Sequence, residues 1–217
     1  MNENRKYDLR KIVGMAVFAA LAYGVTFVFR IPVSFLTFDA KDAVLTIAAF
    51  MYGPLAAIIM ALIPAFIELI TISGTGIYGF LMNFMSSACF AFVASLIYKY
   101  KRTLNGAIIS LYVSTIATVS LMMVLNIIIT PLYMGVERSA VISLIPSLLL
   151  PFNLAKSLMN SAFTMLLYKP VSLAMKRARL IRGEFDTKFN KKSVIIIAVG
   201  ALTLIASILI FIFLKKQ

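Results

Sequence analysis

The sequence predicts an all-α integral membrane protein. Of its 217 residues, 62% are hydrophobic and the mean hydropathy is +0.99, whereas a soluble domain is closer to half apolar. Several apolar runs reach roughly 20 residues, the length that lets a helix cross the hydrocarbon core of a bilayer. Basic residues gather between alternate runs, a pattern typical of cytoplasmic loops.

The apolar runs define the predicted elements in order. They lie at 11–29, 43–51, 54–72, 78–98, 107–133, 147–170 and 193–214. The second run is too short to cross as a straight helix, so we expect it to tilt or to continue into its flanks. The first run has no small-residue cleavage site with a polar sequel, which predicts a retained anchor rather than a cleaved signal peptide.

Three segments follow from these runs. Residues 1–175 are expected to form a six-helix substrate-binding membrane domain, and residues 176–192 a basic cytoplasmic linker. Residues 193–217 add a further C-terminal hydrophobic helix, predicted to be transmembrane. From the sequence alone, this last run either crosses, re-enters the membrane or lies against the bundle.

The net charge of +13 is a topology signal. Most Lys and Arg residues lie before the first run, between the fourth and fifth runs, or after the sixth, and all these positions fall on one side. The positive-inside rule then places the N-terminus in the cytoplasm of a multi-pass plasma-membrane protein. The basic charge therefore points to the lipid bilayer as a partner and not to nucleic acid.

The sequence argues against catalytic and metal chemistry. It has no His, and its one cysteine, Cys89, lies inside an apolar run, so a disulfide framework, haem or zinc site is not expected. No phosphate-binding loop of the form G-x-x-x-x-G-K-[ST] is present. An enzyme would need a nucleophile–base pair or metal ligands, so we predict no enzyme, no catalytic residue, no metal and no cofactor.

Small residues recur in the first run at Ala16, Ala20 and Gly24. Four-residue spacing puts them on one helix face and lets another membrane helix approach closely. That helix belongs either to a partner or to the same chain.

Lys156 stands in an otherwise apolar run, with Asn153 and Asn160 at helical spacing. On a helix all three side chains project from one face. A charge at the bilayer centre costs at least a few kcal/mol unless it has a partner or water. The stripe therefore indicates a ligand site, an ion site or a buried structural network.

The loop 35–42 combines aromatic residues with two acids and a base just before the second run. Either it is a solvated interfacial loop or it forms the rim or lid of a pocket. In the second case Thr37, Phe38 and Lys41 become substrate-binding candidates.

Other polar residues fall near the outer ends of their runs. Glu68 either reaches interfacial water or neutralises Lys156, and Asn83 and Asn126 bond either neighbouring helices or a ligand. Together with Asn153 they predict an outward-facing small-molecule site at one membrane depth. Amide side chains both donate and accept, which favours a neutral solute rich in hydrogen-bonding groups.

Several blocks of the sequence resemble the substrate-binding (S) components of energy-coupling factor (ECF) vitamin transporters, most closely the riboflavin-specific ones. These blocks are 35–42, 52–57, 75–83, 126 with 129–135, 150–156 and 160 with 167–170. The resemblance covers about residues 10–175. It implies a six-helix S-component bundle whose outward pocket binds one vitamin with high affinity, beneath an outer loop that closes over it.

The resemblance also implies roles for single residues. Asn126, Asn153 and Lys156 match positions that contact the flavin or its ribityl chain. Ala16 and Ala20 match a surface that docks on a transmembrane coupling (T) protein, itself bound to two ATP-binding cassette ATPases. The whole S component would then tilt in the membrane. The alternatives are an S component for another vitamin or for flavin mononucleotide (FMN), and an autonomous ion-coupled permease.

Overall fold

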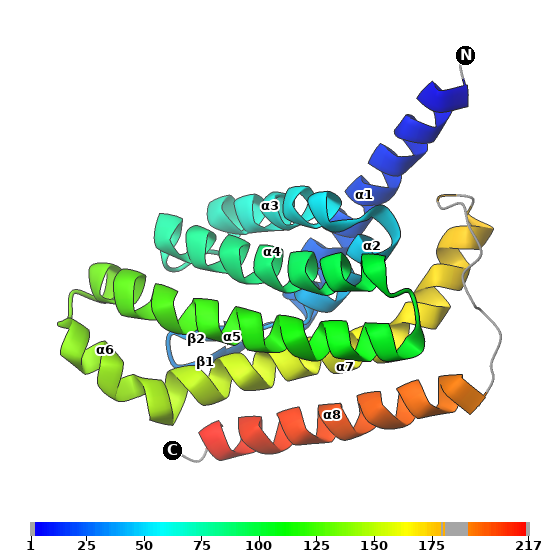
Figure 1. The fold of residues 1–217 in the computed structure, drawn as a ribbon. Coiled ribbons are helices and arrows are strands. Elements are labelled where there is room, and N and C mark those ends of the chain that lie inside the picture. Colours follow the sequence, from blue (N-terminus) through cyan, green and yellow to red (C-terminus); the bar gives the residue numbers. More distant parts are fainter. Residues whose placement is uncertain (1–2, 179, 181–190, 216–217) are drawn as a thin grey trace.

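The computed structural model describes residues 3–178, 180 and 191–215, which form a bundle of long helices with one small hairpin (Figure 1). The helices are α1 (Glu3–Val28), α2 (Lys41–Tyr52), α3 (Pro54–Thr71), α4 (Gly76–Tyr100), α5 (Leu104–Met134), α6 (Arg138–Leu144), α7 (Leu150–Arg177) and α8 (Lys191–Lys215). Strands β1 (Ile31–Val33) and β2 (Leu36–Phe38) form the hairpin, and a π-helical turn, η1 (Ile145–Leu149), joins α6 to α7.

Six helical segments of the described residues are long and apolar enough to cross a membrane, with α6, η1 and α7 counting as one. They correspond to all the predicted runs except 43–51. The chain is therefore a multi-pass membrane protein, as its composition predicts.

The short second run forms α2, the most enclosed helix of the bundle. It has 12 residues, nine of them buried, and it packs against α1, α3, α4 and α7. At about 18 Å it is too short to cross, and it gains only two residues at its start and one at its end. The expected crossing by tilting or extension is therefore wrong. The chain instead reaches the start of α2 through the hairpin.

The turn between α2 and α3 depends on Gly53. Its φ of 96° lies in the left-handed region, and Pro54 directly follows as the first residue of α3. Glycine adopts this φ without steric cost, and proline suits the first helical position. The predicted break at 52–54 is confirmed.

The hairpin β1–β2 was not predicted as strand. Its register pairs Val33 with Leu36, so the turn has two residues, and Ser34 has a φ of 55°. Two-residue hairpins favour turns with positive φ at the first central position. Three-residue strands are too short to show a clear alternation of apolar and polar residues.

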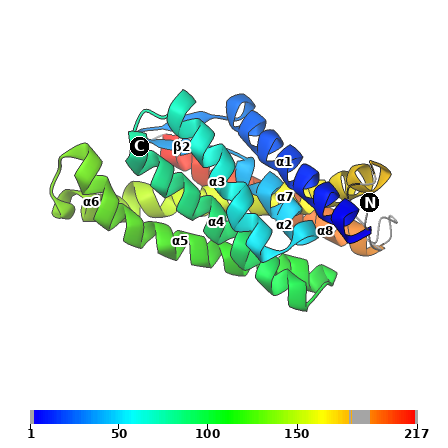
Figure 2. The ribbon, with the colours of Figure 1, turned by 90° about the horizontal axis from the view of Figure 1, so that it is seen from above.

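The additional C-terminal helix is present as α8, which runs antiparallel to α7 along its length (Figures 1 and 2). Ser207 donates a hydrogen bond of 2.7 Å to the carbonyl of Ala155, and a Cβ on Gly200 would meet Met165 at 3.2 Å. Small residues allow such close helix packing in membranes. The predicted linker lies mostly outside the described residues.

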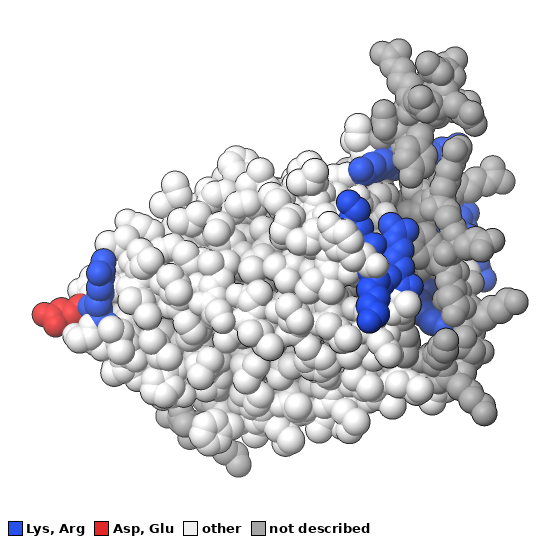
Figure 3. Space-filling model, in the orientation of Figure 1, with Lys and Arg blue, Asp and Glu red and all other residues white. Residues whose placement is uncertain are grey.

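The described basic residues divide the bundle into two ends. One end, which we call the basic end, holds the N-terminal part of α1, the connection between α4 and α5 and the end of α7, with Lys11, Lys99, Lys101, Arg102, Lys176 and Arg177. Lys and Arg side chains gather on the right of Figure 3. The opposite, hairpin end carries β1, β2 and α6. The charge asymmetry that the sequence shows is therefore an asymmetry of the folded bundle.

Candidate functional site

A pocket opens at the hairpin end, between the hairpin and helices α3, α4, α5 and α7. Its polar lining residues are Arg30, Thr37, Glu68, Ser73, Thr75, Asn83, Ser86, Asn153 and Lys156. Its aromatic lining residues are Phe35, Phe80, Tyr133 and Phe152. Polar groups from five segments thus converge on an aromatic-walled cavity, the usual composition of a small-molecule site.

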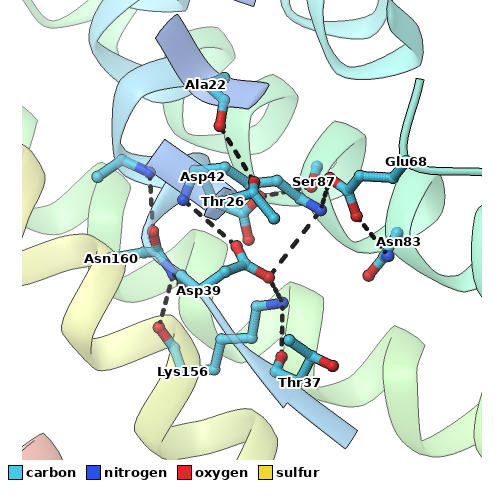
Figure 4. A network of polar contacts seen from close by, with 12 residues as sticks. Ala22, Thr26, Thr37, Asp39, Asp42, Glu68, Asn83, Ser87, Lys156 and Asn160 are labelled. Carbon is cyan, nitrogen blue, oxygen red and sulfur yellow. Dashed lines mark hydrogen bonds and ion pairs between the residues drawn. The ribbon is translucent and has the colours of Figure 1, made fainter. Parts of the chain in front are cut away.

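Lys156, on α7, lies on the floor of this pocket and is paired with Asp39 (Figure 4). Its Nζ is 2.7 Å from Oδ2 of Asp39 and donates a longer bond, of 3.4 Å, to the carbonyl of Thr37. The Asp39 side chain is only 2% exposed. Because a buried charge needs a partner, this pair ties α7 to the segment between β2 and α2.

Glu68, on α3, is paired with Lys41 and not with Lys156. Its Oε1 lies 2.6 Å from Nζ of Lys41, and its Oε2 accepts a bond of 3.0 Å from Asn83 (Figure 4). The predicted pairing of Glu68 with Lys156 is therefore wrong. Lys41, at the start of α2, forms the ion pair with Glu68, and Lys156 forms the ion pair with Asp39.

Asn160 ties α7 to α2 and to the segment between β2 and α2. Its Oδ1 accepts from the backbone N–H of Ala43 at 2.8 Å, and its Nδ2 donates to the carbonyls of Asp39 and Lys156 at 3.1 and 3.0 Å. The first turn of a helix leaves its N–H groups without intrahelical partners, and Asn160 satisfies one of them from another helix. It is fully buried, and it fixes the place of Asp39 without lining the pocket.

The N-terminus of α2 is also stabilised by carboxylates. Asp42 accepts a hydrogen bond from Ser87 of α4, and Asp39 accepts from the backbone N–H of Lys41. Negative charge is favourable at this end of the helix dipole. Asp39, Lys41, Asp42, Glu68 and Lys156 thus form one buried polar cluster directly beneath the pocket.

The predicted site residues divide into two groups. Thr37, Glu68, Asn83, Asn153 and Lys156 line the pocket, whereas Phe38, Lys41, Asn126 and Asn160 do not. Phe38 packs against Phe152 and Phe211, on the side towards α8. Asn126 is fully buried, donates to the carbonyl of Met122 at 2.7 Å and accepts from Thr130, so its bonds stay within α5.

Asp39 and the aromatic wall of the pocket are not among the candidate residues that the sequence suggested. Tyr133 packs edge-on against Phe35 of the hairpin turn and lies 6.3 Å, centroid to centroid, from Tyr78 of α4. Asp39 lies in the same charged loop as Lys41. The only indication in the sequence that Asp39 belongs to the site was that Lys156 needs a counter-ion. Phe35 lies in the loop that the sequence suggested as a possible pocket rim, but nothing in local spacing identified Phe80, Tyr133 or Phe152 as pocket walls.

Ala16, Ala20 and Gly24 face away from the bundle. All three are exposed, while Phe18, Ala19 and Ala22 on the other side of α1 are buried. The row of small residues therefore does not serve helix packing within this chain, which was one of the two interpretations of its spacing. The row is a flat, small-residue face on the outside of the molecule.

The comparisons with known proteins agree with this architecture. A family model described as "ECF transporter, substrate-specific component" matches residues 10–168, so α8 lies beyond the matched region. A solved structure reported as the structure and mechanism of the S component of a bacterial ECF transporter superposes with a TM-score of 0.68. It is 28% identical, and the alignment covers 78% of this chain and 99% of that one.

Two relatives are named riboflavin transporters. RibU of Staphylococcus aureus (strain TCH60) is 31% identical over 190 residues, which is 82% of this chain and 100% of RibU. FmnP of Bacillus subtilis (strain 168) is 25% identical over 174 residues, covering 74% of this chain and 90% of FmnP. This chain therefore belongs to the substrate-specific (S) components of ECF transporters, which bind a substrate for transport and are not enzymes.

Proposed function

We propose that this protein binds riboflavin with high affinity in the pocket at the hairpin end. It would then pass the vitamin inward together with a transmembrane coupling protein and two ATP-binding cassette ATPases. The observation that carries the proposal is the convergence of Asn83, Asn153 and Lys156 on an aromatic-walled cavity, in a chain 31% identical to a riboflavin transporter.

The pocket offers groups that suit a flavin and a polyol chain. Asn153 donates to the carbonyl of Leu149, which leaves its amide oxygen to accept from a ligand hydroxyl. Lys156 has two acceptors in the protein and three N–H donors, so one donor is left for a ligand oxygen. Aromatic side chains on the wall can stack on a planar ring system.

The charge of the site favours riboflavin over its phosphate. The cluster beneath the pocket contains three carboxylates, Asp39, Asp42 and Glu68, and two ammonium groups, Lys41 and Lys156. Both ammonium groups are already paired, so the floor holds no surplus positive charge for a phosphate group. Arg30, at the pocket lining, is the one further cation among the described lining residues.

Binding requires the hairpin to move. The pocket has a volume of about 180 Å³, below the roughly 300–1,000 Å³ usual for small-molecule sites. Phe35, Leu36 and Thr37 of the hairpin line it, so an outward movement of the hairpin would widen it. Loops that close over a ligand in this way also exclude water from the polar contacts beneath.

The proposal predicts that the purified protein is yellow from retained flavin and quenches the fluorescence of added riboflavin. Quenching is expected because the isoalloxazine ring would lie close to Tyr133, whose electron-rich phenol ring can quench an excited flavin. Titration of ligand-free protein should give a tighter dissociation constant for riboflavin than for FMN. A colourless protein that leaves riboflavin fluorescence unchanged would contradict the assignment.

We further infer that the basic end faces the cytoplasm, in accordance with the positive-inside rule. The row Ala16, Ala20 and Gly24 then lies on the membrane-facing side of α1, where a coupling-protein helix can approach closely. Small residues at four-residue spacing support such contacts.

Enlarging this row should separate assembly from ligand binding. Ala16→Leu combined with Ala20→Leu is expected to reduce co-purification with the coupling protein and ATPases at least tenfold, because the added side chains hold the partner helix away. Riboflavin titration should be unchanged. The matched control is Ala201→Leu with Ala206→Leu, two exposed alanines on α8, which should leave both measurements unchanged. Loss of riboflavin binding in the α1 variant would refute the separation.

A further inference from the structure

A second cavity lies at the basic end, at the opposite end of α2 from the riboflavin pocket. It has a volume of about 300 Å³, and basic residues from two separate parts of the chain line it: Lys11 of α1, and Lys99 and Arg102 where α4 leads into α5. The turn between α2 and α3 and the buried Ser95 complete its wall. This cleft shares no lining residue with the pocket at the hairpin end. Its charged lining residues are all basic, whereas the cluster beneath that pocket has more carboxylates than ammonium groups.

None of the three cations of the cleft forms an ion pair with an acidic side chain that the structure describes. Within the described part of the chain, the only ion pairs with acidic side chains are those of Lys41 and Lys156 at the hairpin end. The acidic side chains that the structure describes are Asp39, Asp42, Glu68 and Glu137, and none of them lines the cleft. The cleft therefore carries a concentrated positive charge that favours an anion.

The backbone adds to this preference. Helix α3, with 18 residues, begins in the cleft wall at Pro54, and no side chain caps its start. Helix N-termini carry partial positive charge and free N–H groups, which favour phosphate and other anions. The positive charges of Lys11, Lys99 and Arg102 and the partial positive charge of the α3 N-terminus therefore all favour an anion in the cleft.

An apolar stripe leads away from the cleft along α3. Leu55, which lines the cleft, is 73% exposed, and Ile59, Leu62 and Phe66 continue the same exposed face at helical spacing. This face lies where the hydrocarbon chains of the bilayer surround the protein. A ligand held in the cleft would therefore be continuous with lipid, unlike a free ion from solution.

We propose that this cleft binds the phosphate headgroup of an anionic phospholipid, whose acyl chain lies along Leu55, Ile59 and Leu62 of α3. Basic pockets between membrane helices on the cytoplasmic side suit such headgroups. The bound lipid would fix the basic end of α1, α3 and α4 at the membrane surface.

The test measures lipid binding by native mass spectrometry of the intact chain, with phosphatidylglycerol and phosphatidylcholine titrated separately. Phosphatidylglycerol is expected to bind more tightly. Each basic residue near an anionic headgroup contributes about fivefold, so Lys99→Gln with Arg102→Gln should weaken its binding by about 25-fold. Lys11→Gln alone should weaken it by about fivefold.

The matched control is Lys101→Gln with Lys176→Gln. Both residues are exposed at the same end but do not line the cleft, so phosphatidylglycerol binding should weaken much less than in the cleft double variant, which removes the same charge. Thermal unfolding in phosphatidylcholine alone should be the same for both double variants. If the cleft double variant does not fold, the phosphatidylglycerol binding of the single variant Lys11→Gln tests the proposal in its place.

Three results would overturn the proposal. Equal weakening by the cleft and control variants would show diffuse surface attraction, and equal binding of the two lipids would show no anion site. Inorganic phosphate that binds at least as tightly as phosphatidylglycerol would show a site for a free anion from solution, because the acyl chain would then contribute nothing.

Discussion

Replacing Lys156 with Met is expected to abolish measurable riboflavin binding and to destabilise the bundle. The substitution leaves the carboxylate of Asp39 buried without its nearest ammonium group, since Lys41 is 3.9 Å away and bound to Glu68. Removing one partner of a buried ion pair typically costs about 3–5 kcal/mol. Riboflavin titration and thermal unfolding of the same purified sample measure the two effects.

A second substitution separates the two roles of Lys156. Asp39→Asn in the Lys156→Met background removes the unpaired charge and keeps an oxygen for the N–H of Lys41. We expect it to restore most of the thermal stability and none of the riboflavin affinity. Restored affinity in this double variant would show that Lys156 serves only as a counter-ion and does not contact the ligand.

Asn160→Leu should be as destabilising, although Asn160 does not line the pocket. The substitution leaves the N–H of Ala43 and the carbonyl of Asp39 without the bonds that Asn160 makes. A buried group left unsatisfied costs about 1–3 kcal/mol. Riboflavin affinity should fall as well, because Asn160 fixes the segment that carries Asp39. Thermal unfolding with and without riboflavin measures both.

Asn126→Leu is the matched control, because Asn126 is equally buried and also lies in a long helix. Its hydrogen bonds stay within α5, so its replacement should cost less than half as much stability. Equal destabilisation by the two substitutions would contradict the bridging role of Asn160.

The helical body could be predicted from the sequence because long apolar runs in a membrane have few alternatives to helix. The runs at 54–72, 78–98 and 107–133 became α3, α4 and α5 with ends shifted by at most three residues. The hairpin and α6 could not be predicted in the same way. Their form depends on Ser34, on Pro146 in η1 and on contacts with distant helices, and none of these produces a periodic pattern.

The sequence predicted which polar residues lie near one another, but not which of them form ion pairs. The polar residues Glu68, Asn83, Asn153 and Lys156 do share one pocket, as their places near the outer ends of their runs indicated. Lys156 pairs with Asp39 and not with Glu68 because the hairpin returns the chain to α7 and so places Asp39, directly after β2, beside Lys156. Asn126 is also an asparagine near the outer end of its run. Its side chain, however, is buried and makes its hydrogen bonds within α5, so it does not reach the pocket.

The shortness of α2 bears on the distance that transport must cover. The residues beneath the pocket stand at the N-terminus of a helix of about 18 Å, whereas the hydrocarbon core is about 30 Å thick. If the basic end faces the cytoplasm, as proposed above, a solute bound at Lys156 would lie below the outer surface of the membrane. In the proposed transport cycle the remaining step would be to move the opening of the pocket from one side of the membrane to the other. A tilt of the whole bundle would do this without a channel through it.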